Sequence, residues 1–245
     1  MVRAEQLETE IIMASIHLSK RLQAIADYVD AGERVADIGT DHAFLPMALA
    51  QAGKIDFALA ADVGVGPLNI AKQNIAENGL SDKITTRLAD GLEGIKPEDS
   101  ISTVVIAGMG GELIAKILER GSDHLDGTET LVLSPHRDVP MVRQWLSTND
   151  YGIVAETMLE DEGHVYTVMV AGRTKPDVPY TKADIEFGPI LRKQRSAIFI
   201  SELHRQQQAL TRTLAGLQSA QSNQDSKMAA VKAELKLVEE ELAHD

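Results

Sequence analysis

The segment Val35-Ala-Asp-Ile-Gly-Thr-Asp-His-Ala-Phe-Leu-Pro46 indicates the fold of this chain most clearly. Its apolar start carries Asp37, and Gly39 and Asp41 follow before a helix-like continuation. This pattern predicts a strand that ends in a tight loop at the carboxyl edge of a parallel sheet, where such sheets bind ligands. It is not the dinucleotide-binding pattern, because Asp41 and Phe44 stand where that pattern has glycines. The two acids suit a cationic ligand with hydroxyl and amino groups better than a pyrophosphate.

Short apolar strands and helix-length segments alternate on both sides of this segment. A helix with Leu18, Leu22, Ile25 and Val29 on one face is expected to end at Gly32. Strands are predicted at residues 34–38, 57–61, 84–88, 103–107 and 130–133. Helices are predicted near residues 44–52, 66–78, 111–120 and 138–149. This alternation predicts an α/β fold, with a mostly parallel sheet that is buried on both faces.

The pattern changes after Gly152. Residues 153–157 and 164–171 read as two strands joined by the acidic turn at residues 160–163, which predicts an antiparallel hairpin at the end of the sheet. Residues 173–179 read as a linker, because they include Pro176 and Pro179. The sheet domain is therefore predicted to cover residues 1–175.

Residues 183–245 carry apolar side chains in steps of three and four. This spacing predicts helices that pack on each other and do not alternate with strands. One stretch runs from Ile200 to Leu217 and a second from Met228 to Leu242, with a polar, turn-like segment between them. Asp225 or Ser226 is expected to cap the second helix. Two short heptad stretches joined in this way predict an antiparallel coiled-coil hairpin.

Composition restricts the kind of protein further. Apolar residues make up 44% of the 245 residues, and the chain has no cysteine, so disulfides and zinc–thiolate sites are excluded. No window is apolar enough to span a membrane and the N-terminus lacks a signal-peptide layout, so a soluble, cytoplasmic protein is expected. The net charge is −13, and residues 1–175 hold almost all of it with 15 Lys/Arg against 27 Asp/Glu. A locally basic face on the near-neutral C-terminal part is therefore still possible.

Acids follow three successive strands, and this is the main argument for a ligand. Asp37 in the first turn can hold an amino group, while Gly39 allows close approach of the backbone. Asp62 ends the second strand at the spacing at which an acid binds the ribose hydroxyls of an adenosine cofactor. Asp90 ends the third strand, where it can accept a hydrogen bond from an adenine amino group. Acids are also common in such loops, but the three in register predict S-adenosylmethionine as the cofactor.

These motifs resemble the first three nucleotide-binding motifs of the Rossmann-like class I methyltransferases. After the fourth strand, many enzymes that methylate amino groups of nucleic acids have Asn/Asp-Pro-Pro-Tyr, whereas this chain has Ala107-Gly-Met-Gly-Gly111. Together with residues 37–46 and the helical hairpin, this turn resembles the bacterial tRNA adenine-22 N1-methyltransferase family. The resemblance covers all but about the first dozen residues. It implies methyl transfer to N1 of an adenine, position 22 by resemblance alone, in a tRNA substrate.

The resemblance also implies roles for individual residues. N1 of adenine has a free lone pair, so the enzyme needs mainly positioning and support for the charge that builds on the base. Asp41 is the predicted catalytic residue, with cofactor binding as its alternative role, and His42 is expected to assist or to cap the loop. The predicted cofactor contacts are Asp37, Gly39, Thr40, His42, Asp62, Val63, Asp90, Gly91, Ala107 and Gly108. The predicted substrate contacts are Met109, Gly110, Gly111, Ser134, Pro135, His136, Arg192, Lys193, Arg195, Arg205 and Arg212.

Two other hypotheses follow from the same sequence. In the first, the substrate is a small molecule and the coiled coil forms a homodimer. In the second, the chain is a non-catalytic scaffold that binds a protein partner through the coiled coil. The intact acids Asp37, Asp62 and Asp90 speak against a scaffold, and the basic stretch at residues 192–212 speaks weakly against a small-molecule substrate. No spacing of His, Asp and Glu predicts a metal site.

Overall fold

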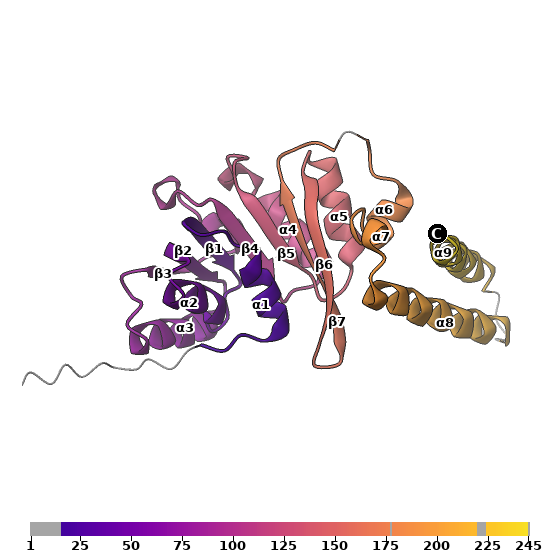
Figure 1. Cartoon of the computed structure of the whole chain (residues 1–245), viewed down its shortest axis with the longest axis horizontal. Coiled ribbons are helices and arrows are strands. Elements are labelled where there is room, and N and C mark those ends of the chain that lie inside the picture. The colour runs from indigo at the N-terminus through magenta and orange to yellow at the C-terminus, as the bar shows by residue number, and fades with distance from the viewer. Residues whose placement is uncertain (1–15, 177, 220–223, 245) are drawn as a thin grey trace, which may run out of the picture.

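A computed structural model describes residues 16–176, 178–219 and 224–244, so the N-terminal extension named above lies outside the described residues. A seven-stranded sheet with the order β3-β2-β1-β4-β5-β7-β6 forms the centre of the molecule (Figure 1). The strands are β1 (Glu33–Ile38), β2 (Ile55–Asp62), β3 (Ile84–Leu88), β4 (Thr103–Ala107), β5 (Thr130–Ser134), β6 (Gly152–Asp161) and β7 (His164–Gly172). β1 to β5 pair in parallel, and β7 pairs antiparallel with both β5 and β6. The predicted α/β class and the terminal hairpin are confirmed.

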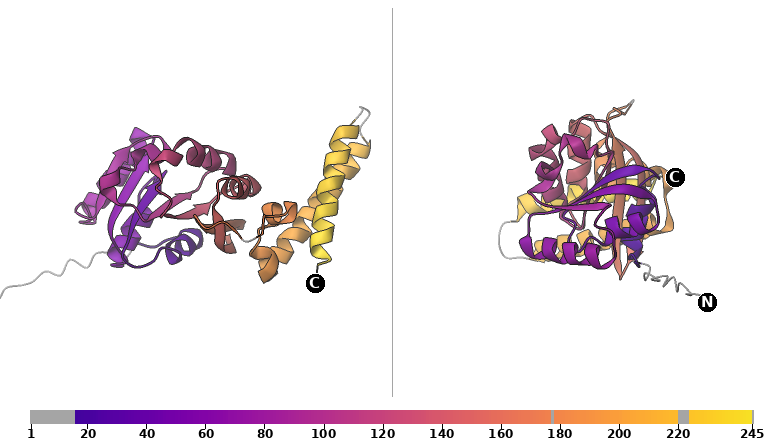
Figure 2. Two further views of the ribbon diagram at one scale, coloured as in Figure 1. Left: turned by 90° about the horizontal axis from the view of Figure 1, so that it is seen from above. Right: turned by 90° about the vertical axis from the view of Figure 1, so that its left-hand side faces the viewer.

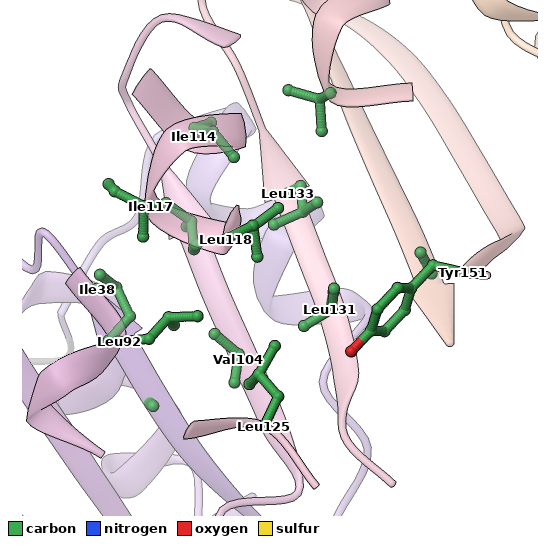
Figure 3. Close-up of a cluster of buried hydrophobic side chains, with 14 of the residues drawn as sticks. Ile38, Leu92, Val104, Ile114, Ile117, Leu118, Leu125, Leu131, Leu133 and Tyr151 are labelled. Carbon is green, nitrogen blue, oxygen red and sulfur yellow. The ribbon is translucent and has the colours of Figure 1, made fainter. Parts of the chain in front are cut away.

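Helices cover both faces of this sheet. They are α1 (Lys20–Asp27), α2 (Phe44–Gln51), α3 (Val65–Glu77), α4 (Gly111–Arg120) and α5 (Val139–Thr148). Val35 and Ala36 of β1 point to opposite faces, as successive strand residues must. Val35 packs in a core with residues of α1, α2 and α3, and Ala36 packs in a second core with residues of α4 and α5. The second core includes Ile114, Leu118 and Leu133 (Figure 3).

The C-terminal helices lie at the end of the molecule opposite β3 (Figures 1 and 2). They are α6 (Lys182–Phe187), α7 (Leu191–Gln194), α8 (Ala197–Ser219) and α9 (Asp225–Leu242). α9 contacts α8, and the two helices share a small apolar core with Met158 of β6. Residues 183–196 form two short helices, because Gly188 has a φ of +96° and Pro189 follows it. Gln224 holds the cap position of α9, so the predicted caps Asp225 and Ser226 lie inside the helix.

A buried ion pair joins the C-terminal helices to the sheet. Arg143 of α5 lies 2.9 Å from Glu156 of β6, and both side chains are almost fully buried. The Arg143 guanidinium donates to the carbonyls of Ile185 and Glu186. The Glu156 carboxylate accepts the Ile190 N–H at 3.0 Å. One charged pair therefore connects α5, β6, the end of α6 and the start of α7.

The strand order puts a topological switch point between β1 and β4. The chain leaves β1 toward β2 on one side, and it leaves β4 toward β5 on the other side. The loops after β1 and β4 therefore separate and leave a crevice at the carboxyl edge, where open α/β sheets bind ligands. No helix among the described residues is long and apolar enough to cross a membrane.

Candidate active site

A cavity of about 440 Å³ lies at the carboxyl ends of β1, β2 and β4. It brings together ten of the sequence-predicted residues. They are Asp37, Gly39, Thr40, Asp41, His42, Asp62, Ala107, Gly108, Met109 and His136. It also contains Arg21, Leu22, Phe44 and Leu45, which were not predicted from the sequence.

Asp37 is a buried carboxyl group of this cavity, and its pKa is shifted. Its side chain is 7% exposed and accepts a hydrogen bond of 2.6 Å from the Thr40 hydroxyl. Burial raises the pKa of Asp37 to about 6, and the nearby Asp62 adds to the rise. The Thr40 hydrogen bond and the positive charge of Arg21 oppose this shift in the pKa. A positively charged ligand group close to Asp37 would therefore stabilise its ionised carboxylate.

The loop after β1 is built from residues in the left-handed region. Gly39, Asp41 and Ala43 have φ values of +75°, +51° and +60°. The φ of Gly39 favours glycine, and a Cβ added there would lie 2.0 Å from Met109 Cε, so the Met109 side chain would have to move. Asp41 and Ala43 each carry a conformational cost of about 1 kcal/mol or more, as often occurs at functional sites.

Asp62 ties the first loop to the second. Its carboxylate accepts the Gly64 N–H at 2.7 Å and the Asp41 N–H at 3.3 Å. The loops after β1 and β2 are thereby fixed to each other, and the Asp62 carboxylate lines the cavity between them.

The side chains at the cavity mouth are more exposed. The Asp41 side chain is 73% exposed, and its Oδ1 lies 3.5 Å from His42 Nε2. Phe44 is 45% exposed and meets the His42 ring edge-on, with the ring centroids 5.7 Å apart. An acid, an imidazole and an aromatic ring are therefore available to a ligand that enters from solvent.

A basic and aromatic cluster from α1, β7 and the loop after β5 lies beside the cavity. Arg21 lies over the Tyr166 ring at 5.4 Å, and His136 contacts the same ring edge-on at 5.4 Å. Burial lowers the pKa of His136, and Arg21 and His164 lower it further. His136 is therefore a neutral side chain at neutral pH.

Some predicted residues lie outside the cavity. These are Val63, Asp90, Gly91, Gly110, Gly111, Ser134 and Pro135. Asp90 forms a two-bond ion pair with Arg120, at 3.0 and 3.1 Å. Ser134 is fully buried, so it does not face a substrate in this structure. Gly111 has a packing role at the start of α4, because an added Cβ would lie 2.1 Å from the Asp138 carbonyl oxygen.

The predicted basic residues of the C-terminal helices fall into two groups. Arg192 pairs with Asp184 and with Glu241, and Arg195 donates to the Glu241 carbonyl at 3.1 Å. These two arginines attach α7 to α9, so their positive charge is already used within the protein. Arg205 likewise pairs with Glu202.

Lys193 and Arg212 form the second group. Both are exposed, and neither forms an ion pair with another described residue. Of the predicted basic residues, these two offer the most accessible charge.

Comparison with known proteins gives the family. Residues 35–240 match the family model TrmK, described as tRNA (adenine(22)-N(1))-methyltransferase. The chain belongs to this family. The tRNA (adenine(22)-N(1))-methyltransferase of Bacillus subtilis is 40% identical over 194 residues, which cover 78% of this chain and 81% of that protein.

Solved structures of the family contain a cofactor. A Streptococcus pneumoniae structure in complex with S-adenosyl-L-methionine has a TM-score of 0.84 and 34% identity, and the match covers 92% of this chain and 100% of that one. The M. capricolum TrmK structure contains the natural cofactor product S-adenosyl-homocysteine. It has a TM-score of 0.81 and 29% identity, over 92% of this chain and 97% of that one. No group of three or more potential metal ligands occurs within the described ranges.

Proposed function

We propose that this protein transfers the methyl group of S-adenosylmethionine to N1 of an adenine in tRNA. Membership of the family over residues 35–240 carries this proposal, and the acid-lined cavity at the switch point supports it. The family description also supplies the target, adenine 22. A tRNA substrate would place the reaction in the cytoplasm.

The donor set of the cavity fits the proposed cofactor. Asp37 would hold the amino group, because its buried carboxylate gains most from a positive charge. Gly39 and Gly108 give the backbone room for close approach, and Asp62 would accept from the ribose hydroxyls. We do not assign Asp90 to the adenine, because such an interaction requires its pair with Arg120 to open.

When bound, S-adenosylmethionine supplies a methyl group on a positively charged sulfur. The adenine N1 lone pair forms the new bond as the sulfur–carbon bond breaks, so no proton has to leave N1. This protein then has to align the base and to offset the positive charge that the ring acquires. We propose Asp41 for the second task, because its exposed carboxylate stands at the cavity mouth.

Asp41→Asn tests this assignment with little disturbance of the backbone. Asparagine adopts the left-handed conformation readily, so the φ of +51° is retained. We expect kcat to fall about 10- to 1000-fold, in the range for removing an electrostatic interaction with a transition state. The affinity for S-adenosylhomocysteine should be unchanged in isothermal titration.

The neighbouring Ala43→Gly is the control, because it alters a residue with a similar φ and removes no charge. If Asp41→Asn lowers cofactor affinity as much as turnover, Asp41 binds the cofactor and the proposed catalytic role is wrong.

We also propose that α8 and α9 form a coiled-coil hairpin that positions the tRNA. Lys193 of α7, which precedes the hairpin, and Arg212 of α8 are the residues we assign to phosphates, because neither forms an ion pair with another described residue. Aromatic residues make up only 4% of the sequence, so several stacked bases are not expected. Recognition of tRNA shape with one extruded base is the mode that fits.

The double variant Lys193→Ala/Arg212→Ala tests this surface. We expect the KM for tRNA to rise about 10-fold, and the slope of log affinity against log salt concentration to become shallower by about one for each phosphate that is no longer neutralised. Lys72→Ala on α3 removes an exposed charge elsewhere and serves as the matched control. An unchanged KM for tRNA and an unchanged salt slope would contradict the assignment of these two residues, and of the hairpin, to the tRNA-binding surface.

The proposed activity is tested by incubating the protein with labelled S-adenosylmethionine and bulk tRNA, followed by nucleoside identification. The proposal expects 1-methyladenosine. Binding of cofactor without transfer to tRNA would favour a small-molecule substrate, with the hairpin as a dimer interface. Absence of cofactor binding would favour a scaffold.

A further inference from the structure

Arg21 of α1 lines the cavity and forms no ion pair with another described residue. Its Nη1 is buried and has no hydrogen-bond partner within the described residues. It points toward the turn after β4, since a Cβ added to Gly108 would lie 3.9 Å from it. No described carboxylate lies within ion-pair distance of Arg21, although Arg21 is close enough to lower the pKa of Asp37.

The surrounding structure holds this guanidinium in place. The backbone N–H of Arg21 donates to the Asp161 carboxylate of β6 at 3.0 Å. The guanidinium stacks on Tyr166 of β7, and α1 contacts both of these strands. The β6–β7 hairpin therefore presents Arg21 to the cavity in a fixed orientation.

A buried charged nitrogen without a partner is costly, and a bound anion would remove that cost. The proposed cofactor brings such an anion, because its amino-acid end carries both an ammonium and a carboxylate. Asp37 and Arg21 line the same cavity and offer the two complementary charges.

We propose that Arg21 binds the carboxylate of the cofactor's amino-acid end, while Asp37 binds the ammonium. This inference rests on the proposed cofactor site. A tRNA phosphate is the other anion that an arginine could receive. The burial of Nη1 beside Gly108 favours the carboxylate, because a polynucleotide backbone stays outside when one base enters a pocket.

Three ligands test the assignment by isothermal titration. S-adenosylhomocysteine has the carboxylate, decarboxylated S-adenosylmethionine lacks only that group relative to S-adenosylmethionine, and 5′-methylthioadenosine lacks the whole amino-acid end. Arg21→Gln should weaken S-adenosylhomocysteine binding about 10- to 100-fold, as expected for a charged hydrogen bond. The same variant should leave the affinities for the other two ligands unchanged. The unaltered protein should bind decarboxylated S-adenosylmethionine at least about 10-fold more weakly than S-adenosylmethionine.

Two variants separate binding from packing. Lys20→Gln removes the adjacent exposed charge and should change none of the three affinities. Arg21→Lys keeps the charge and should recover part of the affinity for S-adenosylhomocysteine.

Equal losses for all three ligands in Arg21→Gln would show a packing role and overturn the proposal. So would an unchanged affinity for S-adenosylhomocysteine with a raised KM for tRNA, which would assign Arg21 to a phosphate. If the unaltered protein fails to bind S-adenosylhomocysteine, the cofactor proposal itself fails. Normal binding of S-adenosylhomocysteine that Arg21→Gln leaves unchanged would reject only the carboxylate assignment.

Discussion

Glu156→Ala is expected to lower the free energy of unfolding by about 3–5 kcal/mol, the usual loss when one partner of a buried ion pair is removed. The substitution leaves the Arg143 guanidinium buried without its carboxylate. It also removes the acceptor of the Ile190 N–H. Urea unfolding followed by circular dichroism measures this loss.

Lys116→Ala is the control for Glu156→Ala, because it breaks an exposed ion pair with Glu112 and should leave the unfolding midpoint unchanged. A loss below about 1 kcal/mol for Glu156→Ala would mean that the pair does not hold the C-terminal helices on the sheet.

Asp37→Asn is expected to increase stability and to abolish cofactor binding. Burial raises the pKa of Asp37 from 3.8 to about 6, so the ionised carboxylate destabilises the folded protein at pH 7. At about 1.4 kcal/mol per pKa unit, the neutral amide should raise the free energy of unfolding by about 2–3 kcal/mol. The same substitution removes the charge proposed to bind the cofactor's ammonium.

The stability gained by Asp37→Asn should depend on pH, because only the ionised form of Asp37 destabilises the folded protein. A raised carboxyl pKa means that the folded state binds more protons than the unfolded state between about pH 4 and 6. The advantage of Asp37→Asn should therefore be absent below pH 4, grow up to about pH 6 and then stay constant. The affinity of the unaltered protein for S-adenosylhomocysteine should fall as the pH drops below about 6. A destabilised Asp37→Asn variant at pH 7 would contradict the raised pKa of Asp37.

The fold was predictable because the strands are short, apolar and separated by helices of regular length. The segment at residues 111–120 was predicted with the bounds that α4 has, and α2, α3 and α5 differ from the prediction by one residue at one or both ends. The first helix was predicted to end at Gly32, whereas α1 ends at Asp27. Residues 183–196 were not predicted correctly. Their two short helices depend on the positive φ of Gly188 and on the hydrogen bond from the Ile190 N–H to Glu156. The spacing of apolar residues in the sequence indicates neither of these.

The residues of the candidate site that could be predicted are those in a sequence motif directly at the carboxyl end of a predicted strand. Asp37, Gly39 and Asp62 line the cavity because parallel strands bring their carboxyl ends to one edge. Asp90 satisfies the same rule, but its partner Arg120 lies 30 residues further along the chain. Arg21 carries no sequence signal, since α1 reaches the cavity through its tertiary packing on β6, β7 and α2.

The most direct test of the proposed function is nucleoside mass spectrometry and position mapping of tRNA incubated with the protein and S-adenosylmethionine. Our proposal predicts 1-methyladenosine at position 22, with the product reduced strongly by Asp37→Asn and by Asp41→Asn. N6-methyladenosine, or no methylated nucleoside from a protein that binds the cofactor, would contradict it.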